Sequence, residues 1–178
     1  MNKVFIGGSI KLSKINKEIK RRIDNIIENR YTILIGDANG IDKSVQEYLF
    51  SKNYSDVVVF CIRDQCRNNV GNWKVKYIEA NYELKGRHLY ALKDIEMAKD
   101  TDFGMMIWDG RSAGTFNNIV NLIKFNKKIL VYLSPKKLFY NISNISDLES
   151  ICSEKVEKKL FSDFYEKPKE ISTIQKEV

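Results

Sequence analysis

Three glycine-bearing turns carry the residues of this chain that are best suited to chemistry. They span residues 7–9, 36–42 and 108–115, and each directly follows a short apolar run of the kind that forms a buried strand. In a parallel sheet the carboxyl ends of the strands lie along one edge, and ligands of open α/β sheets bind at that edge. The sequence therefore predicts one site to which all three turns contribute.

The first two turns offer different chemistry. Gly7, Gly8 and Ser9 stand between a strand and a helix, where backbone amides and a hydroxyl can hold a phosphate; a plain tight turn explains them equally well. Asp42 either caps the helix after the second turn or accepts hydrogen bonds from ribose hydroxyls. The candidate contacts in the second turn are Gly36, Asp37, Ala38, Gly40 and Asp42.

The third turn has the richest set of groups. Trp108 and Asp109 provide a stacking ring and a carboxylate, and hydroxyls and free amides follow at the start of a helix. Its candidate contacts are Trp108, Asp109, Gly110, Ser112, Gly114 and Thr115. This mixture suits a sugar phosphate, although Trp108 can equally fill the core at the end of its strand.

The elements that must position these turns alternate between strand and helix, which is typical of parallel βαβ units. We expect strands at 3–6, 31–35, 56–62, 103–108 and 128–133, and helices near 15–27, 42–52, 92–99 and 115–125. Ser13 is the expected N-cap of the first helix. Residues 63–73 lack periodicity and predict a long loop, and residues 74–84 fit a helix moderately. The fold class is therefore α/β: a Rossmann-like, doubly wound, mainly parallel sheet of about five strands with helices on both faces.

Length and composition fit this fold in a single core. The 178 residues are 43% hydrophobic, and splitting them in two would leave each half marginal. We assign residues 1–140 to the nucleotide-binding domain and 141–178 to a helical appendage, whose end is expected to be disordered from about 168. Because no run approaches a membrane span and no signal segment precedes the first strand, we expect a soluble, cytoplasmic protein without a membrane partner.

The cysteines and the histidine argue against several kinds of site. Cys61, Cys66 and Cys152 are an odd set without CxxC spacing or a histidine cluster, so we expect reduced thiols, no disulfide and no metal site. His88 is the single histidine, and no GxSxG elbow accompanies it. Catalysis by a Ser-His-Asp or Cys-His device is therefore disfavoured.

The positive charge of the chain favours anionic partners in general. The net charge is +7, and the densest basic cluster lies on the first predicted helix, opposite its isoleucines. That cluster contains Lys14, Lys17, Lys20, Arg21 and Arg22. A solvated helix face is its default explanation, and nucleic-acid binding is the less favoured one.

Taken jointly, these residues resemble the SLOG superfamily. This Rossmann-like group contains the DNA-processing protein DprA, the LOG-type phosphoribohydrolases and small nucleotide-sensing proteins of bacterial conflict systems. The resemblance spans roughly residues 3–133 and rests on four segments. They are Gly-Gly-Ser at 7–9, Gly-Asp-Ala-Asn-Gly-Ile-Asp at 36–42, Lys-Asp-Ile-Glu-Met-Ala at 93–98 and Ser-Ala-Gly-Thr at 112–115. It implies that a nucleotide or nucleotide-derived ligand, such as an adenine nucleotide or an ADP-ribose-like molecule, binds across the three turns; no other cofactor is implied.

The chain departs from the LOG-type pattern at a position that bears on catalysis. In those enzymes a glutamate after the last turn works at the N-glycosidic bond, and Asn118 stands in its place. Because an amide cannot act as a general base, a hydrolase would need another acid. The candidates are Asp109 and Asp94, followed by Glu79 and Glu83. Asp37 also replaces a common glycine, so it is expected to contact a sugar or a base instead of a phosphate.

Three functions follow from this pattern. The favoured one is binding or sensing of a nucleotide-like small molecule, with Asn118 among the contacts, because the missing glutamate disfavours turnover. The first alternative is an N-glycosidic hydrolase or transferase acting on nucleoside monophosphates, with Asp109 or Asp94 as its acid. The second is nucleic-acid binding of the DprA kind, with the basic first helix and the loop at residues 63–73 as its contact surface. By analogy with Rossmann-like proteins of this size, we also predict a homodimer.

Overall fold

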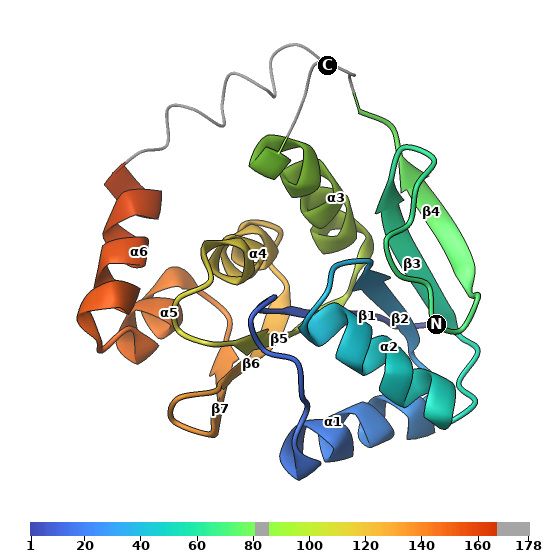
Figure 1. Ribbon diagram of the computed structural model, residues 1–178. Helices are drawn as coiled ribbons and strands as arrows, with labels where there is room; N and C mark the ends of the chain where they lie inside the picture. The colour runs from blue at the N-terminus through green and yellow to red at the C-terminus, as the bar shows by residue number, and fades with distance from the viewer. Residues whose placement is uncertain (81–85, 167–178) are drawn as a thin grey trace.

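A computed structural model describes residues 1–80 and 86–166 of the chain. In this part of the chain seven strands form one sheet, in the order β4-β3-β2-β1-β5-β6-β7 (Figure 1). Six of them run parallel, and β7 runs antiparallel to β6 at one edge. The strands are β1 (Lys3–Gly8), β2 (Thr32–Gly36), β3 (Val57–Ile62), β4 (Lys74–Ile78), β5 (Phe103–Trp108), β6 (Lys128–Leu133) and β7 (Leu138–Ile142). The direction of winding changes at β1, so the chain has the predicted Rossmann-like, doubly wound fold.

Helices cover both faces of this sheet, because side chains of each central strand alternate between two apolar layers (Figure 1). α1 (Lys17–Glu28) and α2 (Ile41–Ser51) pack on the layer that contains Val4 and Ile6. α3 (Gly86–Asp100) and α4 (Ala113–Lys124) pack on the opposite layer, which contains Phe5. The three predicted turns lie at the carboxyl ends of β1, β2 and β5.

The chain after β7 packs on the same core. α5 (Ile145–Ile151) buries Leu148, and α6 (Lys155–Glu166) places Phe161 against Phe116 of α4, with the ring planes at 84°. The weak helical pattern between residues 148 and 164 therefore corresponds to two short helices. The expected disordered end, from about residue 168, lies outside the described residues. Within the described residues, no helix is long and apolar enough to cross a bilayer.

Three predicted details were wrong. The sheet has seven strands instead of about five, because the edge strands β4 and β7 were not expected. Residues 74–84 were expected to be helical, but Lys74–Ile78 forms the edge strand β4. The alternation of lysines with Val75 and Tyr77 suits a half-exposed edge, and pairing with β3 decides the conformation. The first helix is capped by Asn16 instead of Ser13, because the Asn16 side chain accepts a hydrogen bond from the amide of Ile19 at 2.9 Å.

The expectation that all three cysteines are reduced was also wrong. Cys61 and Cys66 form a disulfide, with their Cα atoms 5.2 Å apart. The chain leaves β3 at Ile62 and reverses at Arg63, whose φ of 56° is in the left-handed region. This reversal brings together two cysteines that sequence spacing alone does not pair. Cys152 is free and buried, and burial raises the pKa of its thiol to about 12.

Candidate functional site

The first and third turns are bonded to each other at the carboxyl edge of the sheet. The hydroxyl of Ser9 donates to the Oδ1 atom of Asp109 at 3.0 Å, and the amide of Asp109 donates to the Ser9 hydroxyl oxygen at 3.1 Å. The hydroxyls of Ser9 and Thr115 lie 3.3 Å apart. Because β1 and β5 are neighbours in the sheet, their ends hold these groups in one cluster.

The polar groups of this cluster are engaged within the protein. The same Oδ1 atom of Asp109 accepts hydrogen bonds from the amides of Arg111, at 2.9 Å, and Ser112, at 2.7 Å. Ser112 caps α4, since its hydroxyl oxygen accepts from the Thr115 amide at 3.3 Å. Asp109 and the three hydroxyls therefore fix the start of α4. A phosphate would have to displace these bonds in order to use them.

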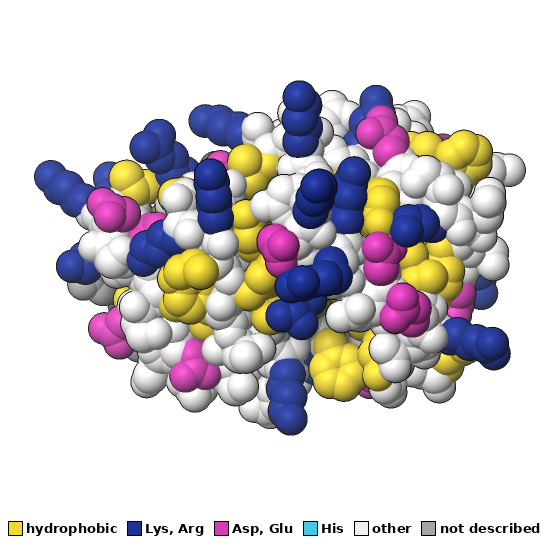
Figure 2. Space-filling model, turned by 90° about the horizontal axis from the view of Figure 1, so that it is seen from below, with side chains coloured by type: hydrophobic (Ala, Val, Ile, Leu, Met, Phe, Trp, Pro, Cys, Tyr) yellow, Lys and Arg dark blue, Asp and Glu magenta, His cyan; other side chains and the backbone are white. Residues whose placement is uncertain are grey.

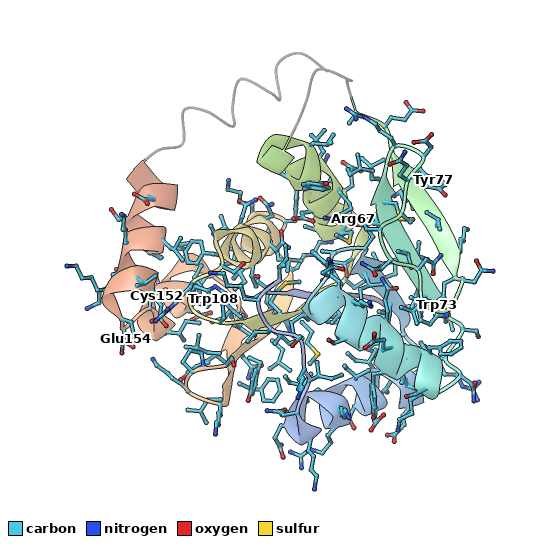
Figure 3. The ribbon with its side chains drawn as sticks, viewed as in Figure 1. Arg67, Trp73, Tyr77, Trp108, Cys152 and Glu154 are labelled. Atoms are coloured by element: carbon cyan, nitrogen blue, oxygen red, sulfur yellow. A yellow bond between two sulfur atoms is a disulfide. The ribbon has the colours of Figure 1, made fainter. Side chains whose placement is uncertain are left out.

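The aromatic ring and the glycines of these turns also have structural roles. Trp108 is fully buried, and its indole donates to the backbone oxygen of Ser112 at 3.1 Å, so the ring fills the core beneath α4 (Figure 3). A Cβ atom on Gly8 would lie 2.4 Å from the backbone oxygen of Ile107, which explains that glycine by close packing. Gly7 meets only side chains, and Gly110, at φ 75°, lies against the carboxylate of Glu157. Gly114, in contrast, is exposed in the first turn of α4, and a Cβ atom there would meet the Ser112 hydroxyl at an ordinary contact distance of 4.0 Å.

Asp37, in the second turn, lies in a buried ion cluster. Lys93 from α3 places its Nζ atom 2.6 Å from Oδ1 of Asp37, and both side chains are 3% exposed. Arg67 adds hydrogen bonds from its backbone amide at 3.1 Å and from Nε at 3.2 Å and Nη2 at 2.7 Å. Burial alone would raise the pKa of Asp37, but the hydrogen bonds of Arg67 and the charge of Lys93 hold it well below its usual range. Asp37 thus anchors Lys93 and Arg67.

Asp42 packs over Gly36 at the start of α2. A Cβ atom on Gly36 would lie 2.4 Å from Oδ2 of Asp42 and 3.1 Å from Nζ of Lys93, so glycine is needed there. The same Oδ2 accepts a hydrogen bond from the amide of Ala38 at 3.3 Å, and Gly40 enters α2 with φ 78°. Burial raises the pKa of Asp42 to about 7, although the charge of Lys93 opposes this shift.

Asn118 and Asp94 join α4 to α3 beside this cluster. Asn118 is 8% exposed, and its side chain hydrogen-bonds the carboxylate of Asp94. Burial raises the pKa of Asp94 to about 6, against the charge of Lys93 and the hydrogen bond of Asn118. In the part of the chain that the structure describes, the buried Oδ1 atom of Asn118 accepts no hydrogen bond. Since buried carbonyl oxygens normally have a donor, this atom is available to a ligand.

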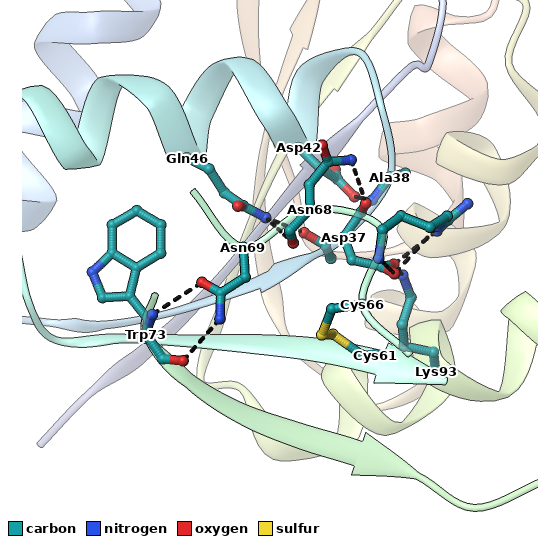
Figure 4. The surroundings of a disulfide bond; sticks show 12 residues. Asp37, Ala38, Asp42, Gln46, Cys61, Cys66, Asn68, Asn69, Trp73 and Lys93 are labelled. Carbon is teal, nitrogen blue, oxygen red and sulfur yellow. Dashed lines mark hydrogen bonds and ion pairs between the residues drawn. A yellow bond between two sulfur atoms is a disulfide. The ribbon is translucent and has the colours of Figure 1, made fainter. Parts of the chain in front are cut away.

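Two charged residues of the cluster, Lys93 and Arg67, were not among the predicted contacts. Lys93 stands in one of the segments that carry the SLOG resemblance, which was the available signal. Arg67 comes from the loop after β3, and its guanidinium lies 4.4 Å from the ring centre of Tyr90 on α3 (Figure 3). Gln46 fastens this loop, donating to the backbone oxygen of Gly36 at 2.9 Å and accepting from Val70 at 3.0 Å (Figure 4). No local pattern in the sequence reveals the path of the loop after β3.

The acids proposed for a hydrolase differ in their surroundings. Asp109 already accepts three hydrogen bonds on one oxygen, whereas Asp94 is half-buried beside Asn118 with a raised pKa. A carboxyl group that titrates near neutral pH can act as a general acid or base. Glu79 is exposed beyond the end of β4, and Glu83 lies outside the described residues. Of the three acids that the structure describes, Asp94 has the surroundings that suit acid catalysis best.

The basic residues of the first helix lie on a different surface. Figure 2, seen from the side on which α1 lies, shows Lys and Arg side chains over most of the face, with Asp and Glu between them. Arg21 pairs with Glu18 at 2.9 Å, and Lys20 lies over the ring of Tyr48. Lys14, Lys17 and Arg22 are exposed. This surface is basic overall but interrupted by acids.

Comparisons with known proteins identify the fold. The sequence matches no protein-family model and no curated protein. The chain is similar to a solved structure of DNA processing protein A from Helicobacter pylori, with a TM-score of 0.56 and 16% sequence identity. The fold is DprA-like. The match covers 73% of this chain and 64% of that chain, whose description concerns single-stranded DNA binding. At this identity the likeness extends to the fold alone.

Proposed function

We propose that this protein binds a nucleotide or nucleotide-derived ligand at the carboxyl edge of its sheet. The observation that carries the proposal is the buried, unpartnered Oδ1 atom of Asn118, which lies beside Asp94 where α3 and α4 meet the turns. An acceptor without a donor is a group that a ligand would complete, and among the described residues the Nδ2 atom of Asn121, one turn further along α4, is a buried donor without an acceptor. In doubly wound folds, ligands bind at this edge near the change in winding direction.

The charges at the edge orient such a ligand. Asp42 and Asp94 disfavour a phosphate near Asn118, so the neutral part of a nucleotide, with its hydrogen-bond donors, is assigned to that side. Gly114 is exposed at the N-terminus of α4, where the helix dipole favours an anion. The phosphate is assigned to this end. Asp37 serves as an internal anchor in this arrangement.

Direct detection of a ligand tests the proposal. The purified protein is denatured and its supernatant examined by mass spectrometry for co-purified nucleotides, and the stripped protein is titrated with AMP, ADP and ADP-ribose by calorimetry and thermal shift. We expect at least one of these probes to bind and raise the melting temperature. A protein that carries no nucleotide and responds to none of the probes would refute the proposal.

Binding of single-stranded nucleic acid is the second candidate. It is supported by the likeness in fold to a protein whose structure is described as binding single-stranded DNA, and by the exposed basic side chains of α1. The acids between these side chains make it the weaker candidate. A gel shift with single-stranded DNA at low salt distinguishes the two functions, because it requires no free nucleotide.

A further inference from the structure

We propose that the Cys61–Cys66 disulfide is a redox switch that holds Arg67 on Asp37, and that reduction by a dithiol releases this contact. The disulfide joins the penultimate residue of β3 to the loop that follows it, and the two cysteines are five positions apart in sequence (Figure 4). Cys61 belongs to the rigid sheet, whereas Cys66 belongs to the loop. The bond therefore ties the loop to the sheet beside the ion cluster.

The residue after Cys66 is Arg67, so a movement of Cys66 acts directly on the contact between Arg67 and Asp37. The backbone amide of Arg67 donates to Oδ2 of Asp37 at 3.1 Å, only one peptide bond away from Cys66. Its guanidinium binds the same carboxylate through Nε at 3.2 Å and Nη2 at 2.7 Å. A shift of Cys66 necessarily moves this amide. The position of Cys66 thus sets the geometry of all three bonds.

The rest of the loop has anchors of its own, so the effect of reduction is local. Asn68 donates to the backbone oxygen of Asp37 at 2.8 Å, and Gln46 accepts from Val70 at 3.0 Å. Between the cysteines, Asp64 and Gln65 are exposed, and the backbone amide of Gln65 donates to the backbone oxygen of Ile62 at 3.3 Å. Reduction should loosen residues 63–67 while the segment from Asn68 onward stays in place.

The two sulfur atoms differ in access, which fixes the order of the chemistry. Cys66 is half-buried and Cys61 is fully buried, so a thiolate of the dithiol attacks the sulfur of Cys66. The S–S bond breaks, and the sulfur of Cys61 leaves and takes up a proton. The second thiolate of the reductant then attacks the mixed disulfide and releases Cys66, which is also protonated. The dithiol becomes a cyclic disulfide, having supplied the two electrons.

Release of Arg67 changes the charge balance of the cluster. Asp37 keeps Lys93 at 2.6 Å but loses the guanidinium, so its pKa rises from its lowered value. Asp42 and Asp94 lie in the electrostatic field of the same groups. The charge of Arg67 lowers the pKa of Asp94, so its release should raise that pKa and change how this carboxylate at the carboxyl edge of the sheet titrates.

Trypsin cleavage after Arg67 tests the switch without any ligand. In the oxidised full chain the bonded side chain should resist cleavage, and dithiothreitol should speed it by about tenfold, because local opening controls proteolysis. Cys152→Ser keeps the disulfide and should respond as the natural chain does. Cys61→Ser with Cys66→Ser should be cleaved at the fast rate with or without the reductant. Equal rates in the oxidised and reduced natural chain, or three free thiols before reduction, would overturn the proposal.

Hydrogen exchange on the natural chain gives a second readout, which does not depend on how the double variant folds. Peptides that cover residues 63–67 should lose amide protection on reduction, and those covering β3 and residues 68–73 should keep it. Unchanged protection, or a loss spread over the whole sheet, would contradict a local switch. Both experiments can succeed even if no nucleotide binds.

Discussion

Asn118 is the residue on which the nucleotide proposal depends. Its amide nitrogen is used on Asp94, and its Oδ1 atom is the acceptor left over. Asn118→Ala should therefore weaken binding of the most tightly bound nucleotide probe by about tenfold, which corresponds to the free energy of one hydrogen bond. It should also lower the free energy of unfolding by about 1–2 kcal/mol, because the hydrogen bond from its amide nitrogen to the carboxylate of Asp94 is lost. Calorimetric titration measures the affinity.

Asn117→Ala is the matched control for this substitution. Asn117 is the half-buried neighbour of Asn118 on α4, and its replacement removes an amide of the same size. Nucleotide affinity should be unchanged in this variant. Equal affinities in both variants would show that Asn118 does not contact the ligand.

Asp42 makes the stability of the protein depend on pH. Its folded pKa of about 7 lies above the unfolded value of 3.8, so between these values the folded state binds more protons. Stability is therefore present at low pH and is lost as pH rises through 7, by about 2 kcal/mol or more. Asp94, with a pKa raised to about 6, adds to the same slope. Asp37 does not, because its lowered pKa leaves it ionised in both states across this window.

Urea unfolding between pH 4.5 and pH 7.5 measures this slope. In Asp42→Asn, which keeps the size of the side chain and an oxygen for the amide of Ala38, the slope should become shallower and the protein should be more stable at pH 7.5. Parallel pH profiles for the natural chain and the variant would show that Asp42 titrates normally in the folded protein.

At the scale of elements, the glycines of the turns divide into those required by packing and those that leave space. A Cβ atom on Gly36, at the end of β2, would meet Oδ2 of Asp42 at 2.4 Å. Gly36→Ala should therefore lower the free energy of unfolding by about 2–4 kcal/mol, since the carboxylate and Lys93 must both shift. Gly114→Ala, in the first turn of α4, should be neutral or stabilise by about 0.5 kcal/mol, because alanine favours the helix. Denaturant titration measures the free energy of unfolding of both variants. If Gly114→Ala lowered it as much as Gly36→Ala, this division of the glycines would be wrong.

The sequence predicts the central elements better than the edges. Strands such as β2 and β5 are apolar on both faces, so their residues form continuous hydrophobic runs. The edge strands β4 and β7 carry exposed residues such as Lys74 and Leu138, and their pairing with a neighbouring strand decides their structure. The turns at the carboxyl edge were predicted for the same reason as the central strands. Arg67 was not, because a disulfide and the buried Gln46 set the path of its loop.

At the scale of the whole molecule, the two candidate functions use different surfaces. The proposed nucleotide site lies at the carboxyl edge of the sheet, where α3 and α4 meet the turns, whereas the exposed basic residues lie on the outer face of α1 (Figures 1 and 2). Substitutions on one surface should therefore leave binding at the other unchanged. This separation makes the two proposals independently testable.

Nucleic-acid binding on the α1 face should depend steeply on salt, because each phosphate contact releases a counterion. Replacing Lys17, Lys20 and Arg21 by alanine removes three positive charges, and Arg21 loses only an exposed pair with Glu18, so the fold should tolerate the change. Single-stranded DNA binding by the natural chain should weaken by at least about tenfold between 50 mM and 200 mM salt, and the triple variant should bind more weakly at 50 mM.

Lys155, Lys158 and Lys159 on α6 supply a control of equal charge far from α1 in the sequence. Fluorescence anisotropy with a labelled oligonucleotide measures both series. If removing the α6 lysines weakens binding as much as removing the α1 charges, the attraction follows net charge alone and α1 is not a binding surface.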